Sequence, residues 1–188
     1  RCSPTVNSCG PALPPDATVH EAGHIVAAMA MGMPVHDAIV AESGAGRAGV
    51  FAPVRDILAE TQPPPAADVR DAYLDVICLV WRGVATGEAV RRYAVMLTAG
   101  RQAELMAAGV ALVGELHMHD PDHEQARALL DATGQRLALG YCQRLARHVL
   151  SASWRRVADI AAQLKTTGYW SASAGANGTR ELKTCSLV

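Results

Sequence analysis

The sequence predicts a mainly α-helical fold, a helical bundle with a small β-hairpin or sheet after the first helix. Half of the residues are apolar, with a single Phe and four Tyr, and Ala, Val and Leu lead this group. That mixture is typical of packed helices rather than of a β-sandwich or barrel. Apolar residues also recur at intervals of three and four in several segments, which is the spacing of one helix face. A chain of 188 residues can bury one good core, so we expect one domain over residues 16–188.

The first helix is expected over residues 16–31, after an irregular, proline-rich arm at 1–15. Its residues are strong helix formers, two prolines precede it, and Gly32 follows it. Asp16 is a suitable N-cap. Thr18 is an alternative N-cap, because Glu21 three residues later would complete a capping box.

Two short strands joined by a glycine turn are expected over residues 35–54, where β-branched residues alternate with glycines. The turn at 44–49 also matches the G-x-G-x-x-G pattern of dinucleotide-binding loops, but that pattern requires a helix directly after it. The residues that follow are strand-like and end at Pro53, so we expect a β-turn.

Helical spacing returns in four later segments, at residues 69–81, 89–108, 121–152 and 154–164. Residues 171–178 are rich in Ser, Gly and Ala, so we expect a loop there before a short end at 181–188.

Charge and cysteine content restrict the partners and the compartment. The 17 basic and 18 acidic residues nearly cancel, so we expect no nucleic acid partner. The apolar runs are shorter than the roughly 20 residues that cross a bilayer, so we expect no membrane span. Five cysteines scattered along the chain favour reduced thiols and a cytoplasmic location, although Cys2 and Cys9 could pair in an oxidising setting. Because the chain begins with Arg1 rather than Met, we expect either that it was cut from something longer or that its first residues are missing from the sequence.

The sharpest motif is His20-Glu21-Ala22-Gly23-His24, an H-E-x-x-H pattern in the first predicted helix. With about 3.6 residues per turn, His20 and His24 share one face, so both imidazoles can bind one ion. Glu21 is turned by about 100° from His20, which keeps it off the metal but near a water molecule. We therefore predict a zinc site with His20 and His24 as ligands and Glu21 as the general base.

A third zinc ligand must come from farther along the chain. The metzincin spacing would place it at Ala30, which excludes that class. Two candidates remain from the residues alone, Glu104 and the cluster of His and Asp at 117–123. Within the cluster, Asp120 before a proline is a typical N-cap, so Asp122 is expected in the exposed first turn of the next helix.

These motifs resemble the peptidase domain of the FtsH-type ATP-dependent zinc proteases. The likeness begins at the H-E-A-G-H run and continues through residues 34–36 and 44–51. Ala99-Gly100-Arg101-Gln102-Ala103-Glu104 is similar to the family's Gly-Gly-Arg-x-Ala-Glu helix, with Ala99 in place of the first Gly. Further likenesses are Asp122 with Ala126, the helix at 154–164, and the turn at 168–171.

The resemblance implies zinc as the cofactor and Asp122 as the third ligand beside His20 and His24. It also implies that the strand after the first helix is an edge, which an extended polypeptide substrate joins by backbone pairing. The sequence contains no G-x-x-x-x-G-K-[ST] phosphate loop, so the resemblance covers the peptidase domain without the ATPase module. An ATPase partner would then act in trans. We expect a zinc metallopeptidase of the HExxH type that hydrolyses flexible or unfolded polypeptides.

Two other classes of function are compatible with the sequence. One is a catalytically silent metallopeptidase-like module that binds or regulates a partner, which an assay on unfolded casein would distinguish from a peptidase. The other is a helical interaction protein with an accidental motif, which would contain no zinc. The sequence leaves the oligomeric state open.

Overall fold

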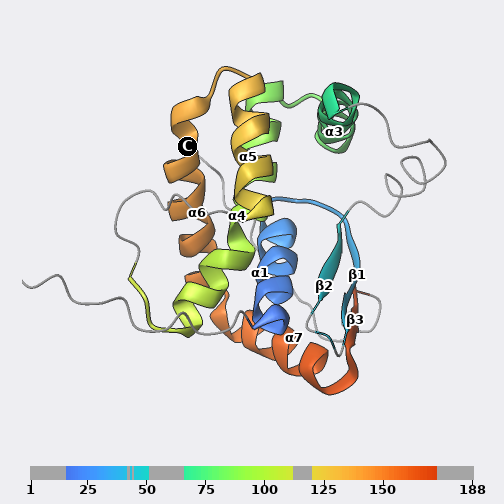
Figure 1. Cartoon of the computed structure of the whole chain (residues 1–188), viewed down its shortest axis with the longest axis vertical. Helices are drawn as coiled ribbons and strands as arrows, with labels where there is room; N and C mark the ends of the chain where they lie inside the picture. Colours follow the sequence, from blue (N-terminus) through green and yellow to red (C-terminus); the bar gives the residue numbers. More distant parts are fainter. Residues whose placement is uncertain (1–15, 42, 44, 51–65, 112–119, 173–188) are drawn as a thin grey trace, which may run out of the picture.

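The computed structural model describes residues 16–41, 43, 45–50, 66–111 and 120–172, which form helices around a small sheet (Figure 1). The α-helices are α1 (Ala17–Ala30), α3 (Ala66–Val80), α4 (Thr86–Ala107), α5 (Pro121–Ala132), α6 (Leu139–Ala152) and α7 (Trp154–Thr167), with a short 3₁₀ turn at Arg136–Ala138. The strands are β1 (Val35–Val40), β2 (Gly46–Val50) and β3 (Tyr169–Ser171). This confirms the predicted fold class.

Helix α1 is the central element of the fold. Every residue from 21 to 28 is buried, so the helix is covered on all sides rather than along one stripe. Helix α4 lies against one side, the sheet against another, and α7 against its lower part (Figure 1). The N-cap is Asp16, whose side chain accepts a hydrogen bond from the Thr18 amide at 3.1 Å. The first helix is therefore confirmed, and the alternative cap at Thr18 is not adopted.

Helices α1 and α4 cross at backbone contact. A Cβ atom added at Gly23 would lie 2.8 Å from both the Ala103 Cβ and the Ala99 carbonyl oxygen. Contacts this short leave no room for a side chain between the helices. The glycine of the H-E-x-x-H motif therefore brings the middle of α4 directly against the two histidines.

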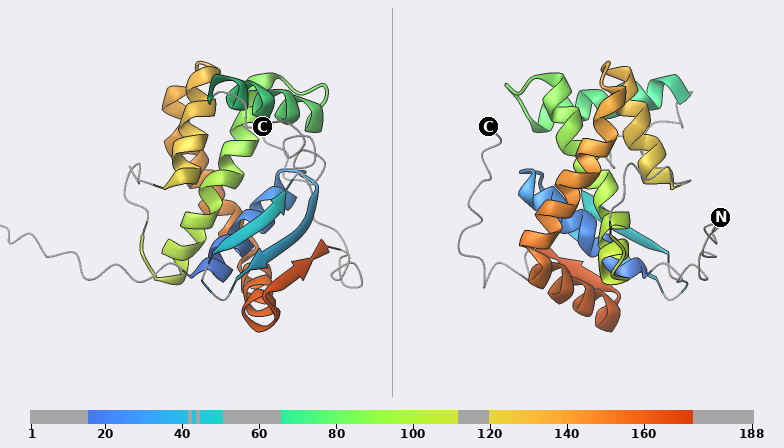
Figure 2. Two further views of the ribbon diagram at one scale, coloured as in Figure 1. Left: turned by 45° about the vertical axis from the view of Figure 1, so that its right-hand side comes forward. Right: turned by 90° about the vertical axis from the view of Figure 1, so that its left-hand side faces the viewer.

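Strand β1 lies in the middle of the sheet, with order β2-β1-β3 and both neighbours antiparallel (Figure 2). Ala38 pairs with Ala48 on one side and with Trp170 on the other. The prediction that the strand after the first helix forms an edge is wrong, because β3 covers its second side. Within the described residues, β2 is an edge strand instead.

Two further sequence predictions need correction. Residues 121–152 were expected as one helical stretch but form α5 and α6, separated by Gly134 in the left-handed region at φ 71°. The Gln135 side chain anchors this break to the start of α4 by donating a hydrogen bond to the Gly87 carbonyl at 2.9 Å. Ser171 was expected in a loop but ends β3, a strand too short to show an alternating pattern.

Other expectations lie outside the described residues, namely the arm at 1–15, the end of the second strand at 51–54, and the segment at 173–188. Among the residues that the structure describes, Cys78 and Cys142 are free thiols. No helix in those same ranges combines the length and the apolar character needed to cross a membrane.

Candidate metal centre

Helices α1 and α5 bring three ligand-type side chains to one point. The Nε2 atoms of His20 and His24 lie 2.9 Å apart, and Oδ2 of Asp122 lies 3.2 Å from each of them. The two rings meet edge to face, at 75°. Asp122 reaches this point because Asp120 caps α5, accepting a hydrogen bond from the Asp122 amide at 2.9 Å. The cap and first turn predicted for this helix are confirmed, although Asp122 is half-buried rather than exposed.

Each histidine is held by the nitrogen that faces away from this point. Nδ1 of His24 donates to the Met96 carbonyl oxygen at 2.8 Å, and Nδ1 of His20 donates to Oε1 of Glu104 at 3.1 Å. Both partners only accept hydrogen bonds, so the single N–H proton of each neutral ring lies on Nδ1. Such a bond on the outer nitrogen is the usual way in which proteins orient histidines that bind metals.

The two Nε2 atoms therefore turn lone pairs towards each other and towards a carboxylate. Three electron-rich atoms at 2.9 to 3.2 Å repel one another unless a cation lies between them. Either a proton or a metal ion can fill that role.

The spacing suits a zinc ion. Ligands about 2.0–2.1 Å from a tetrahedral zinc ion stand roughly 3.3 Å apart, and the observed separations are 2.9, 3.2 and 3.2 Å. Two imidazoles and one carboxylate also form the type of ligand set found in catalytic zinc sites, where one position stays open for water. The residues present therefore fit the metal that the resemblance implies.

The electrostatics of the group agree with a cation at this point. Burial would lower the pKa of His20, but the hydrogen bonds with Asp122 and Glu104 outweigh it and raise this pKa to about 10. Burial likewise would raise the pKa of Asp122, but hydrogen bonds with His20 and His24 hold it well below its usual range. Asp122 is thus a carboxylate, and the carboxylates around His20 favour a positive charge at this point.

Glu21 stands beside this group but does not join it. The residue is only 6% exposed, and burial raises the pKa of its carboxyl above the ordinary value, against the opposing effect of His24 and His20. A carboxylate whose pKa is shifted towards neutrality is suited to accept a proton and give it up again near pH 7.

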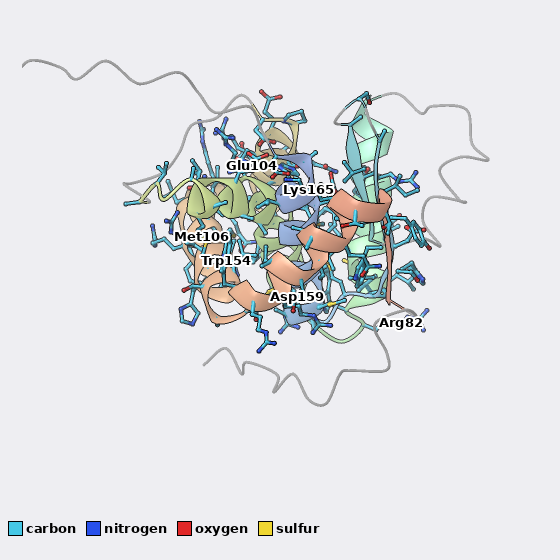
Figure 3. All side chains as sticks on the ribbon, turned by 90° about the horizontal axis from the view of Figure 1, so that it is seen from below. Arg82, Glu104, Met106, Trp154, Asp159 and Lys165 are labelled. Carbon is cyan, nitrogen blue, oxygen red and sulfur yellow. The ribbon has the colours of Figure 1, made fainter. Side chains whose placement is uncertain are left out.

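The structure separates the candidates for a third ligand. Asp122 meets the two Nε2 atoms, whereas Glu104, on α4 close to α1 (Figure 3), binds the outer nitrogen of His20 and an Arg101 guanidinium nitrogen. Glu104 therefore orients a ligand instead of acting as one. His123 is fully buried and stays out of the group. His117 and His119 lie outside the described residues.

Sequence reasoning did not identify Gly100 as part of this centre, although a glycine inside a long helix is a usable signal. A Cβ atom added there would lie 2.6 Å from Nε2 of His20 and 2.6 Å from Nε2 of His24. The bare backbone of α4 therefore borders the place that an ion would occupy.

Comparison with protein-family models, curated proteins and solved structures found no match for this chain. The resemblance to the FtsH-type peptidases stays a prediction, and so does zinc. What the structure contributes is the convergence of His20, His24 and Asp122, with Glu21 beside them.

Zinc affinity is expected to rise with pH. In protein stripped of metal, His20 has a pKa of about 10, raised from 6.5, so it keeps a proton throughout the neutral range. That proton must leave before Nε2 can bind an ion, and its competition fades as the pH approaches 10. Competition against a chelator should show the affinity increasing roughly tenfold per pH unit between about pH 6 and 8. A constant affinity over that range would contradict the assignment of His20.

Gly100→Ala is expected to lower zinc affinity by at least about 100-fold, because the added methyl group would press on both ligand nitrogens. Equilibrium dialysis measures this effect, with circular dichroism to check the helix content. Gly87→Ala is the matched control, since the atoms nearest to its methyl group belong to the Gln135 side-chain amide, with Nε2 at 2.9 Å. Unchanged affinity in Gly100→Ala would show that α4 does not border the ion.

Proposed function

We propose that this protein is a zinc-dependent peptidase that hydrolyses peptide bonds in flexible or unfolded polypeptides. The observation that carries the proposal is the convergence of three electron-rich atoms, from His20, His24 and Asp122, beside a buried carboxylate that is not one of them. A structural zinc site normally uses four protein ligands, whereas a site with three and a neighbouring base is the catalytic type. That arrangement favours hydrolysis.

The roles of the residues follow from their positions. His20, His24 and Asp122 would hold the zinc ion, which when bound lowers the pKa of a water molecule and polarises the carbonyl group under attack. Glu21 accepts the proton of the attacking water and later delivers it to the departing amine. Met96 and Glu104 keep the two imidazoles turned so that their Nε2 atoms face the ion.

The substrate class follows from the sheet. Strand β2 is an edge within the described residues, and the backbone of Ala48 in it is close enough to the Glu21 carboxylate to act on its pKa, in the lowering direction. A polypeptide that paired with this edge would pass close to the general base. Such pairing requires an extended backbone, which folded proteins rarely expose, so flexible and unfolded chains are the expected substrates.

Glu21→Gln is expected to reduce kcat on unfolded casein by at least about 100-fold, because the amide cannot accept the proton. Its zinc content should match that of the wild type, since Glu21 is not a ligand. Both quantities are measured on the same preparations, by fluorescence of labelled casein and by elemental analysis. Retained activity in the variant would exclude Glu21 as the base. A wild-type protein that holds zinc without cleaving casein would indicate a non-catalytic module.

A further inference from the structure

The face of the sheet that covers α1 carries small residues. Gly46 pairs with Val40, and Ala48 pairs with Ala38, so Gly46, Ala48 and Ala38 point to the same side of the sheet. Ala38 is completely buried, and both β1 and β2 pack against α1 (Figure 2). The sheet therefore comes close to the helix that carries the H-E-x-x-H motif.

The backbone of β2 at Gly46 lies close to the side chain of Glu21. A Cβ atom added at Gly46 would lie 2.5 Å from Oε1 of Glu21, 2.7 Å from Cγ and 3.0 Å from Cδ. These three atoms span most of the Glu21 side chain, so the β2 backbone lies along it rather than touching one end. Because Glu21 is only 6% exposed, its carboxylate has little free space into which it could turn.

From this contact we infer that Gly46 is a positioning residue for the general base, and that β2 forms the wall against which the Glu21 carboxylate is held. This inference deepens the proposed function and rests on it for the catalytic consequence. The same strand is the edge proposed to receive the polypeptide. A substrate paired with β2 would therefore also stiffen the strand that positions Glu21.

Gly46 and Gly100 consequently have separate effects. Gly100 borders the ligand nitrogens, whereas the three atoms nearest to a Cβ at Gly46 all belong to the base, Glu21. A methyl group at Gly46 should displace Glu21 while leaving His20, His24 and Asp122 free to bind zinc. The Gly46→Ala variant should then keep its zinc and its KM but lose about 100-fold in kcat, the effect expected of a catalytic group misplaced by roughly 1 Å.

A thermal-unfolding cycle tests the contact itself, without relying on activity. Gly46→Ala should lower the Tm by roughly 3–10 °C through overpacking. In a Glu21→Ala background, which removes the atoms that the new methyl group would meet, the same change should lower the Tm far less. Equal losses in the two backgrounds would overturn the inference whether or not the protein is a peptidase. Gly87→Ala, outside the site, serves as the control and should lower the Tm equally in both.

The catalytic half of the experiment compares Gly46→Ala in the wild-type and Glu21→Gln backgrounds, with kcat and KM on labelled casein and zinc content as readouts. If Gly46 acts through Glu21, the substitution should cost little further activity once the carboxylate is an amide. Unchanged kcat in the single variant, or loss of its zinc, would overturn the inference. An inactive wild type would instead refute the proposed function, while the unfolding cycle would still decide the contact.

Discussion

The repulsion among three electron-rich atoms is the constraint on which the structure of this centre depends. Nδ1 of His20 donates its proton to Glu104, and Nδ1 of His24 donates its proton to the Met96 carbonyl oxygen. The Nε2 lone pairs of both rings therefore face Asp122 at hydrogen-bond distance. Such an arrangement is stable only with a positive charge at its middle. In the metal-free protein, a proton supplies this positive charge. A zinc ion also supplies it, with a coordination geometry that leaves one position for water. The chemistry proposed for the protein follows from that single requirement.

The rest of the fold serves to keep neighbours close to α1. Two elements approach the motif at three glycines: α4 at its own Gly100, β2 at its own Gly46, and α4 again at Gly23 of α1. Each approach fixes a different part of the centre, namely the ion's place, the general base and the crossing of the two helices. A single buried helix can therefore carry two ligands and a base on different sides, because each side meets a different neighbour.

The local features were predictable from the sequence and the tertiary ones largely were not. Asp16 and Gly32 mark the ends of α1, and the H-E-x-x-H spacing alone places His20 and His24 on one face. The choice between Asp122 and Glu104 could not be made from residues, since it depends on how α4 and α5 meet α1; only the family resemblance favoured Asp122. The resemblance implied that the strand after the first helix is an edge, and the sequence could not correct this, because β3, three residues long, gives no alternating pattern. The contacts of Gly46 and Gly100 are likewise set by long-range packing.

Elemental analysis of the purified protein tests whether this centre binds zinc. Wild-type protein and a His24→Ala variant would be prepared in parallel and their zinc content measured per chain. About one zinc ion per chain is expected in the wild type, and a large loss is expected in the variant, in which one ligand nitrogen is missing. Wild-type protein without zinc, or equal metal in both preparations, would contradict zinc binding at this centre.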